Sequence, residues 1–423
     1  MLRRALANVA LLLGTLALLV GVGEIVLRLF PDVTTFLAAR DARGEGSFNP
    51  FQPDGLLGYA LRPGAVAHQE LGGHVTEVRV NALGLRGPEA SPRPTPGRPR
   101  VLVLGDSFAF GFGVAEGSTL RDRLEASLRA RGVDAEVLSA GVPGWSTDHQ
   151  LVYLRSRGFA LEPALVLLVV CENDPSDLAW NRLTLDDARL PTRIETTRRM
   201  IDPGGRLRYV NAGRTALPGV GFPAKAWLED HSRVYHWLRF RLVKAETALR
   251  ARGARAEAPA WLATDPERPI ATLAPDELQR ALAASPEFQL RYHRYLLAAI
   301  ERDAAAHGAA LRIVTTADPS SPKAPEAVQA LHRDCAAMGE RCLDGRLLLG
   351  EPDVERLFLP DGHWSAEGSA RIAERLADWL APDPALAPGR KAAAPVTLRA
   401  SLHPRSRTDS FRLSPDGGRS SAG

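Results

Sequence analysis

Hydrophobic and polar positions alternate along the middle of the chain in two distinct patterns. Short apolar runs rich in β-branched residues predict buried strands at 101–104, 135–139, 164–171, 311–316 and, more weakly, 341–343. Stretches with helical spacing of apolar residues predict helices at 120–130, 151–157, 288–307, 325–338 and 366–380. Strands that alternate with helices form a parallel sheet covered on both faces. We therefore expect residues 99–381 to form a three-layer α/β/α sandwich.

The first 30 residues have a different pattern. The run from Ala5 to Gly23 carries no charge and follows Arg3 and Arg4. About 20 apolar residues cross the hydrocarbon core of a bilayer, and flanking positive charge keeps the amino end in the cytoplasm. We interpret residues 1–30 as an uncleaved transmembrane signal anchor, which puts the rest of the chain outside the cytoplasm. A cleaved signal peptide and a buried helix are the alternatives.

Three further segments lie outside the alternating pattern. Residues 31–98 are rich in Pro and Gly, with one clear strand pattern at 75–80, and predict a juxtamembrane β-rich extension and linker. The pattern loosens again at 178–286, an insertion whose alternatives are a lid over the site and surface decoration. Residues 382–423 lack any period and predict a disordered tail.

Composition and charge narrow the class of protein. The 423 residues are 45% hydrophobic and 24% charged, which is ordinary for a globular protein. Lys and Arg number 53 against 49 Asp and Glu, a net charge of +4, and no basic stripe is interleaved with aromatic residues. We therefore expect no nucleic-acid partner, and the oligomeric state stays open.

The three cysteines bear on compartment and metal binding. Cys335 and Cys342 are seven residues apart and can close a small loop in an oxidising compartment, whereas Cys171 lies in an apolar run and is expected to be a buried thiol. The sequence has no C-x-x-C motif and no His-rich spacing. We expect neither a metal site nor a cofactor.

The first predicted strand of the sandwich ends on a candidate nucleophile. Residues 101–104 run directly into Gly105, Asp106 and Ser107. Chemistry in open α/β sheets takes place at the carboxyl ends of the strands. A serine at a strand-to-helix turn is either a helix cap or a nucleophile, and residues elsewhere in the chain must decide between the two.

Other predicted strand ends and loops supply the remaining parts of a serine hydrolase. Gly141 follows the second strand, Asn173 follows the third, and Asp361 and His363 precede the last helix. A serine hydroxyl needs an imidazole base, and a carboxylate orients that imidazole. Backbone N–H groups near a glycine and an Asn amide can stabilise the oxyanion of an acyl-transfer intermediate.

Competing motifs do not fit. The sequence Gly105-x-Ser107-x-Ala109 lacks the second glycine of the α/β-hydrolase elbow. After Gly111-x-Gly113, Glu116 stands where a dinucleotide fingerprint has its third glycine, and no Walker sequence is present.

Four ordered blocks of residues resemble the SGNH, or GDSL-type, hydrolases. The blocks are Gly105-Asp106-Ser107, Gly141, Asn173-Asp174 and Asp361-Gly362-His363, and the resemblance covers about residues 99–381 without the insertion. It implies a flavodoxin-like fold with Ser107 as nucleophile, His363 as general base and then acid, and Asp361 as its orienting carboxylate. It also implies an oxyanion hole formed by the N–H groups of Ser107 and Gly141 and the amide of Asn173.

Two departures from the family pattern widen the choice of function. Cys171 stands where the family usually has a glycine, and Asp361 and His363 are separated by one residue rather than two. The shorter spacing, followed by Trp364, resembles the subset associated with O-acetylation of exported polysaccharides. The leading hypothesis is an extracytoplasmic serine esterase acting on an O-acyl ester such as an acetylated carbohydrate. The alternatives are an O-acetyltransferase for an envelope or exported polysaccharide and a non-catalytic envelope binding protein.

Each candidate residue also has a purely structural interpretation. Asn173 is also typical of a turn at a strand end, and Asp361 with His363 is also typical of a solvated loop pair. Asp106 and Asp174 are expected to buttress their loops. The aromatic side chains near the blocks are expected to be core, namely Phe108, Phe110 and Trp364.

Overall fold

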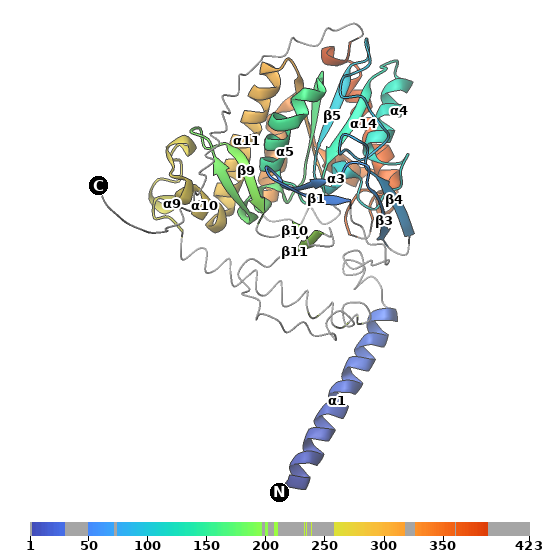
Figure 1. Cartoon of the computed structure of the whole chain (residues 1–423), viewed down its shortest axis with the longest axis vertical. Helices are drawn as coiled ribbons and strands as arrows, with labels where there is room; N and C mark the ends of the chain where they lie inside the picture. Colours follow the sequence, from blue (N-terminus) through green and yellow to red (C-terminus); the bar gives the residue numbers. More distant parts are fainter. Residues whose placement is uncertain are drawn as a thin grey trace, which may run out of the picture.

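A five-stranded parallel sheet forms the centre of the molecule (Figure 1). The computed structural model describes residues 2–29, 50–71, 74–196, 199–201, 207–209, 232, 234, 238, 258–317, 326–359 and 361–387. The sheet strands are β5 (Arg100–Gly105), β6 (Glu136–Gly141), β7 (Leu165–Val170), β12 (Ala310–Thr315) and β13 (Cys342–Leu343). Their order, β13-β12-β7-β5-β6, is the flavodoxin-like doubly wound order, and the predicted parallel sheet is confirmed.

Helices cover both faces of this sheet and make the three predicted layers (Figure 1). Because side chains alternate along a strand, Val101 and Val103 pack on one side of β5 while Leu102 and Leu104 pack on the other. The first side is covered by α4 (Leu120–Ala130) and α14 (Ala366–Leu380). The second is covered by α5 (Thr147–Tyr153), α11 (Pro286–Ala306) and α12 (Glu326–Ala337).

The predicted helices agree with these elements, with one correction. The helix expected at 151–157 begins earlier, at Thr147, and its second half is the π-helical turn η2 (Leu154–Gly158) followed by η3 (Phe159–Leu161). Short elements complete the domain: α3 (Ser107–Phe110), α6 (Asp174–Asp177), η7 (Gly339–Arg341), η8 (Gly345–Gly350) and α13 (Val354–Leu357).

Residues 50–80 do not stand apart from the sandwich as a separate extension. They form two hairpins, from β1 (Phe51–Asp54) with β2 (Gly58–Leu61) and from β3 (Val66–Leu71) with β4 (His74–Arg79). Buried Phe51, Leu57 and Tyr59 belong to the same hydrophobic cluster as Leu102, and the Tyr59 hydroxyl donates to the carbonyl oxygen of Pro143 at 2.9 Å. This part of the predicted 31–98 segment is therefore integrated into the main core.

The predicted insertion at 178–286 starts directly after α6. It contains η4 (Leu178–Trp180), the hairpin of β8 (Asn181–Leu185) and β9 (Pro191–Thr196), and the strands β10 (Arg199–Ile201) and β11 (Leu207–Tyr209). Its later part holds α9 (Trp261–Thr264), η5 (Ile270–Thr272) and α10 (Pro275–Ala284). Most of residues 202–257 lie outside the described residues, including nearly all of 226–250, whose sequence pattern is amphipathic.

The two ends of the chain complete the description. Helix α1 (Leu2–Leu29) covers the segment predicted as an anchor, and no helix among the described residues qualifies as a membrane span. Residues 382–387, predicted as the start of the disordered tail, instead pack on the domain through η9 (Pro384–Leu386), with Ala385 and Leu386 buried. Asp383 forms an ion pair with Arg312 of β12, which ties this segment to the sheet. Residues 388–423 lie outside the described residues.

Candidate active site

The turn that carries Ser107 is built by a close approach and a cap. A Cβ atom on Gly105 would lie 2.7 Å from the Cβ of Ala109, so only glycine lets β5 pass this close to α3. Asp106, and not Ser107, is the N-cap of α3, because its Oδ1 accepts the Phe108 N–H at 2.9 Å. The cap interpretation of Ser107 is therefore wrong, and its side chain is available for another role.

His363 lies against Ser107. The imidazole Nε2 is 2.8 Å from the Ser107 Oγ, a hydrogen-bond distance. His363 lies between α13 and α14 in a loop whose shape is held by backbone bonds, because the N–H of Leu359 donates to the His363 carbonyl oxygen at 2.7 Å. A base within hydrogen-bond reach is what a serine nucleophile requires.

Asp361 holds the other side of the imidazole. Its Oδ2 is 3.0 Å from Nδ1 of His363, and its Oδ1 accepts the His363 backbone N–H at 3.2 Å. The Nδ1–H direction does not point squarely at Oδ2, so the side-chain contact is close but is not a well-aligned hydrogen bond. Burial raises the pKa of Asp361, but the bonds and charge of His363 outweigh it and hold this pKa below its usual value.

Two further carboxyl groups are buried beneath the site. Asp106 Oδ2 accepts the Ser107 hydroxyl at 3.2 Å, and Asp174 accepts the backbone N–H of Cys171 at 3.1 Å. Burial raises the pKa of both groups, and the charge of Asp106 raises the pKa of Asp174 further. Both carboxyls accept backbone N–H groups of their loops, as a buttressing role requires.

Of the two predicted oxyanion donors other than Ser107, Asn173 lines the cavity and Gly141 does not. Asn173 lies in the cavity wall with Ser107 and His363, and its amide donates to Asp177 at 3.0 Å. The second amide hydrogen of a fixed Asn can serve an oxyanion.

Gly141 does not lie in that wall. It ends β6 beneath α3, where an added Cβ would lie 2.3 Å from the Phe110 nitrogen, and its N–H donates to the Ser139 hydroxyl at 3.3 Å. The glycine of this loop that reaches the cavity is Gly144, three residues later. The sequence pattern alone did not separate the two glycines, since both follow the same strand.

A cavity of about 480 Å³ lies over these groups, within the range of small-molecule sites. Its wall combines aromatic side chains with polar ones, and its members include Phe108, Phe112, Pro143, Gly144, Glu172, Asn173, Ser176 and Thr316 besides Ser107, Asp361 and His363. The rings of Phe108 and Phe112 flank the imidazole, with centroids 4.9 and 5.1 Å from that of His363. Phe110 and Trp364 are buried core side chains, as predicted.

Arg86 supports the nucleophile turn and was not recognised in the sequence. Its guanidinium is buried and donates to the carbonyl oxygens of Phe110, Gly111 and Val114, while its Nε lies 2.8 Å from Glu116. These bonds hold the loop that leaves α3. The only sequence signal was an arginine in a turn-rich segment, which is typical of a solvated surface.

No cluster of His, Cys, Asp and Glu among the described residues has the arrangement of a metal site. The cysteines pair as the spacing suggested, with a disulfide between Cys335 and Cys342, and Cys171 is a buried free thiol.

Comparison with known proteins identifies similar structures but no close relative. No family model and no curated protein matches the chain. A lipolytic protein of the G-D-S-L family from Desulfitobacterium hafniense is 12% identical, with coverage of 66% of this chain and 99% of the other and a TM-score of 0.34. A lipase/acylhydrolase from Enterococcus faecalis is 14% identical, with coverage of 67% and 95% and a TM-score of 0.34. An acylhydrolase from Bacteroides fragilis is 11% identical, with coverage of 68% and 91% and a TM-score of 0.32. These similar structures are lipolytic proteins and acylhydrolases, and at this level of likeness the chemistry of the present chain rests on its own side chains.

Proposed function

We propose that this chain is a serine esterase of the SGNH type that hydrolyses an O-acyl ester. The observation that carries the proposal is the 2.8 Å contact between Ser107 Oγ and His363 Nε2, with Asp361 at 3.0 Å from the other imidazole nitrogen. The four sequence blocks and the position of these side chains in one cavity support it.

The reaction follows from the roles of these groups. Ser107 Oγ attacks the ester carbonyl while Nε2 of His363 takes the hydroxyl proton. The tetrahedral intermediate collapses, the alcohol leaves with that proton, and an acyl-serine remains. Water then attacks the acyl-serine with His363 again as base, which releases the carboxylic acid and restores Ser107. Asp361 keeps the imidazole oriented and stabilises its protonated form.

The negative charge of the intermediate needs donors. We assign the N–H of Ser107, which is the first residue of α3 and has no partner within that helix, together with the side-chain amide of Asn173. Gly144, and not Gly141, is the glycine of the second loop that lines the cavity.

The test is hydrolysis of p-nitrophenyl acetate by the purified protein. We expect turnover by the wild type and a fall of at least about 10³-fold in kcat for Ser107→Ala. Ser127→Ala, which removes the same hydroxyl from the middle of α4, is the matched control and should keep full activity. Equal activity of wild type and Ser107→Ala would disprove the nucleophile.

Acyl transfer to a sugar hydroxyl is the second candidate, favoured by the one-residue spacing of Asp361 and His363 with Trp364 after it. The same acyl-serine would then be attacked by a sugar hydroxyl instead of water. Adding an oligosaccharide acceptor should yield acetylated sugar at the expense of free acetate. Acetate as the only product over a range of acceptors would favour the esterase.

We further propose that the catalytic domain lies outside the cytoplasm and that residues 1–30 anchor it. The uncharged run after Arg3 and Arg4 supports the anchor, and a disulfide between Cys335 and Cys342 suits an oxidising compartment. Carbonate extraction of cell membranes and a periplasmic reporter fused after Ala387 test this. Recovery of the full-length chain in the carbonate-soluble fraction would contradict the anchor.

A further inference from the structure

A second array of ionisable side chains reaches the cavity through Glu172. It starts at Glu172, which follows β7 and lies in the cavity wall next to Asn173. Glu172 Oε1 is 3.0 Å from Nε2 of His332, a side chain of α12 that is completely buried. The Glu172 side chain keeps 16% of its surface exposed and borders the cavity. The His332 imidazole holds one of its oxygens.

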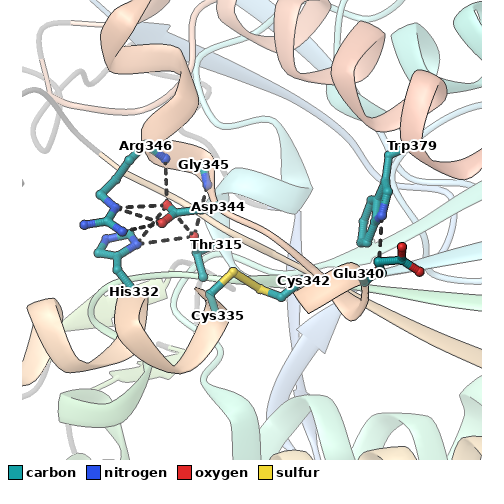
Figure 2. Close-up of a disulfide and its surroundings, with 9 residues drawn as sticks. All are labelled: Thr315, His332, Cys335, Glu340, Cys342, Asp344, Gly345, Arg346 and Trp379. Atoms are coloured by element: carbon teal, nitrogen blue, oxygen red, sulfur yellow. Dashed lines mark hydrogen bonds and ion pairs between the residues drawn. A yellow bond between two sulfur atoms is a disulfide. The ribbon is translucent and has the colours of Figure 1, made fainter. Parts of the chain in front are cut away.

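The array continues from His332 to Asp344 and Arg346 (Figure 2). Nδ1 of His332 lies 3.1 Å from Oδ1 of Asp344, and Asp344 is in turn bound by the guanidinium of Arg346. Thr315, at the end of β12, accepts the Gly345 N–H at 3.1 Å and fixes the loop that carries Asp344. Both imidazole nitrogens thus have a carboxylate partner.

The disulfide joins the two segments that hold the array. Cys335 follows His332 on α12 by three residues, and Cys342 precedes Asp344 by two. Figure 2 shows the sulfur bridge next to His332, Asp344 and Thr315. The bridge therefore limits movement of the imidazole relative to the carboxylate that orients it.

The contacts within the array shift the pKa values of His332 and Asp344 in opposite directions. Burial lowers the pKa of His332, but its bonds to Asp344 and Glu172 outweigh this and raise the pKa above its usual value. The same contacts and Arg346 hold the pKa of Asp344 well below its usual range. Glu172 and Asp344 thus hold the two nitrogens of one imidazole, and a carboxyl oxygen in such a contact has a further lone pair that can accept a hydrogen bond.

We propose that Glu172 is a specificity residue that accepts hydrogen bonds from hydroxyl groups on the alcohol part of the ester, so that the substrate is an acylated sugar or polyol. His332 and Asp344 are its positioning residues. The inference rests on the proposed esterase function. The neighbouring wall supports it, because Ser176 and Thr316 add hydroxyl groups and Phe112 adds an aromatic face, a combination that suits a polyhydroxylated ring.

The experiment compares two acetate esters on the full chain. One is an O-acetylated methyl xyloside, whose alcohol part carries hydroxyl groups, and the other is p-nitrophenyl acetate, whose alcohol part carries none. Glu172→Ala should lower kcat/KM for the acetylated xyloside about tenfold or more, mainly through KM, and change that for p-nitrophenyl acetate less than about threefold. His332→Asn should cause the same selective loss, whereas Glu326→Ala, an exposed change on the same helix as His332, should cause none.

Each outcome decides a different claim. Equal losses for both esters in Glu172→Ala would overturn the specificity role while leaving the esterase intact. No turnover of either ester by the wild type would overturn the esterase and this inference with it. If Glu172→Ala does not fold, Glu172→Met, which keeps the length of the side chain but removes its hydrogen-bond acceptors, is compared instead, with Kd for the acetylated xyloside measured on the Ser107→Ala background by calorimetry. An unchanged Kd there also rejects the inference.

Discussion

Ser107 and His363 are 256 residues apart in the chain, and their side chains are 2.8 Å apart in the folded protein. The two side chains meet because Ser107 follows β5, an inner strand of the sheet, and His363 precedes α14, which packs beside α4 on one face of that sheet. The wound topology thus brings distant loops to one edge, as expected at the carboxyl ends of parallel strands.

Asp361→Asn should lower kcat for p-nitrophenyl acetate by roughly 10²- to 10⁴-fold, because the amide cannot stabilise a protonated imidazole and favours the wrong tautomer. Steady-state kinetics measure this, and thermal unfolding checks that the variant is folded. Asp353→Asn makes the same chemical change at an exposed residue whose φ of 56° Asn also tolerates, and should have no effect. Equal rates for Asp361→Asn and the wild type would remove Asp361 from the mechanism.

Gly141→Ala should reduce both stability and activity even though its N–H does not face the cavity. The new Cβ would meet the Phe110 nitrogen at 2.3 Å and the Ala109 carbonyl carbon at 2.5 Å, so α3 must shift and Ser107 with it. We expect a loss of about 1–3 kcal/mol in the free energy of unfolding, measured in urea. Gly132→Ala is the control for steric contact, because an added Cβ there has open space around it. Any destabilisation of this variant comes from the backbone strain of its φ of +81°. A Gly141→Ala protein with wild-type stability would contradict the close contact.

The sequence predicted the parts of this molecule whose signals are local. Buried runs such as 164–171 and the helix at 120–130 were recognisable because their periodicity depends only on neighbouring positions. The chemical types at strand ends are equally visible in the sequence, which is sufficient to identify Ser107, Asn173, Asp361 and His363 as candidates.

Long-range packing was not predictable in the same way. Gly141 and Gly144 occupy the same short loop, and only the position of α3 decides which one reaches the cavity. The hairpins at 50–80 looked like a separate extension because their apolar residues meet their partners only in the folded core. The two ionic partners of His332, Glu172 and Asp344, likewise come from separate segments of the chain.

Arg86→Met should destabilise the protein strongly. The change removes the guanidinium that pairs with the Glu116 carboxylate and the donors for three carbonyl oxygens beside α3. Breaking a buried ion pair from one side costs about 3–5 kcal/mol, which chemical denaturation would detect. Arg93→Met, a change at an exposed arginine of the same region, is the control and should cost less than about 0.5 kcal/mol. Comparable stabilities of the two variants would mean that the Arg86 contacts contribute little.

His293 should make the protein sensitive to acid. Its imidazole is fully buried, with Nδ1 2.7 Å from the Thr147 hydroxyl, and burial lowers its pKa from 6.5 to about 3. Below pH 6.5 the unfolded chain binds a proton at this residue that the folded chain does not, so the free energy of unfolding falls with decreasing pH by up to about 1.4 kcal/mol per pH unit until the pH reaches about 3. His293→Asn keeps a group able to bond Thr147 but does not titrate. Urea unfolding at pH 7.5 and 5 should show a smaller acid loss for this variant than for the wild type. His68→Asn makes the same change at an exposed histidine and is the matched control. An equal acid loss in the wild type and in His293→Asn would show that His293 is not the source.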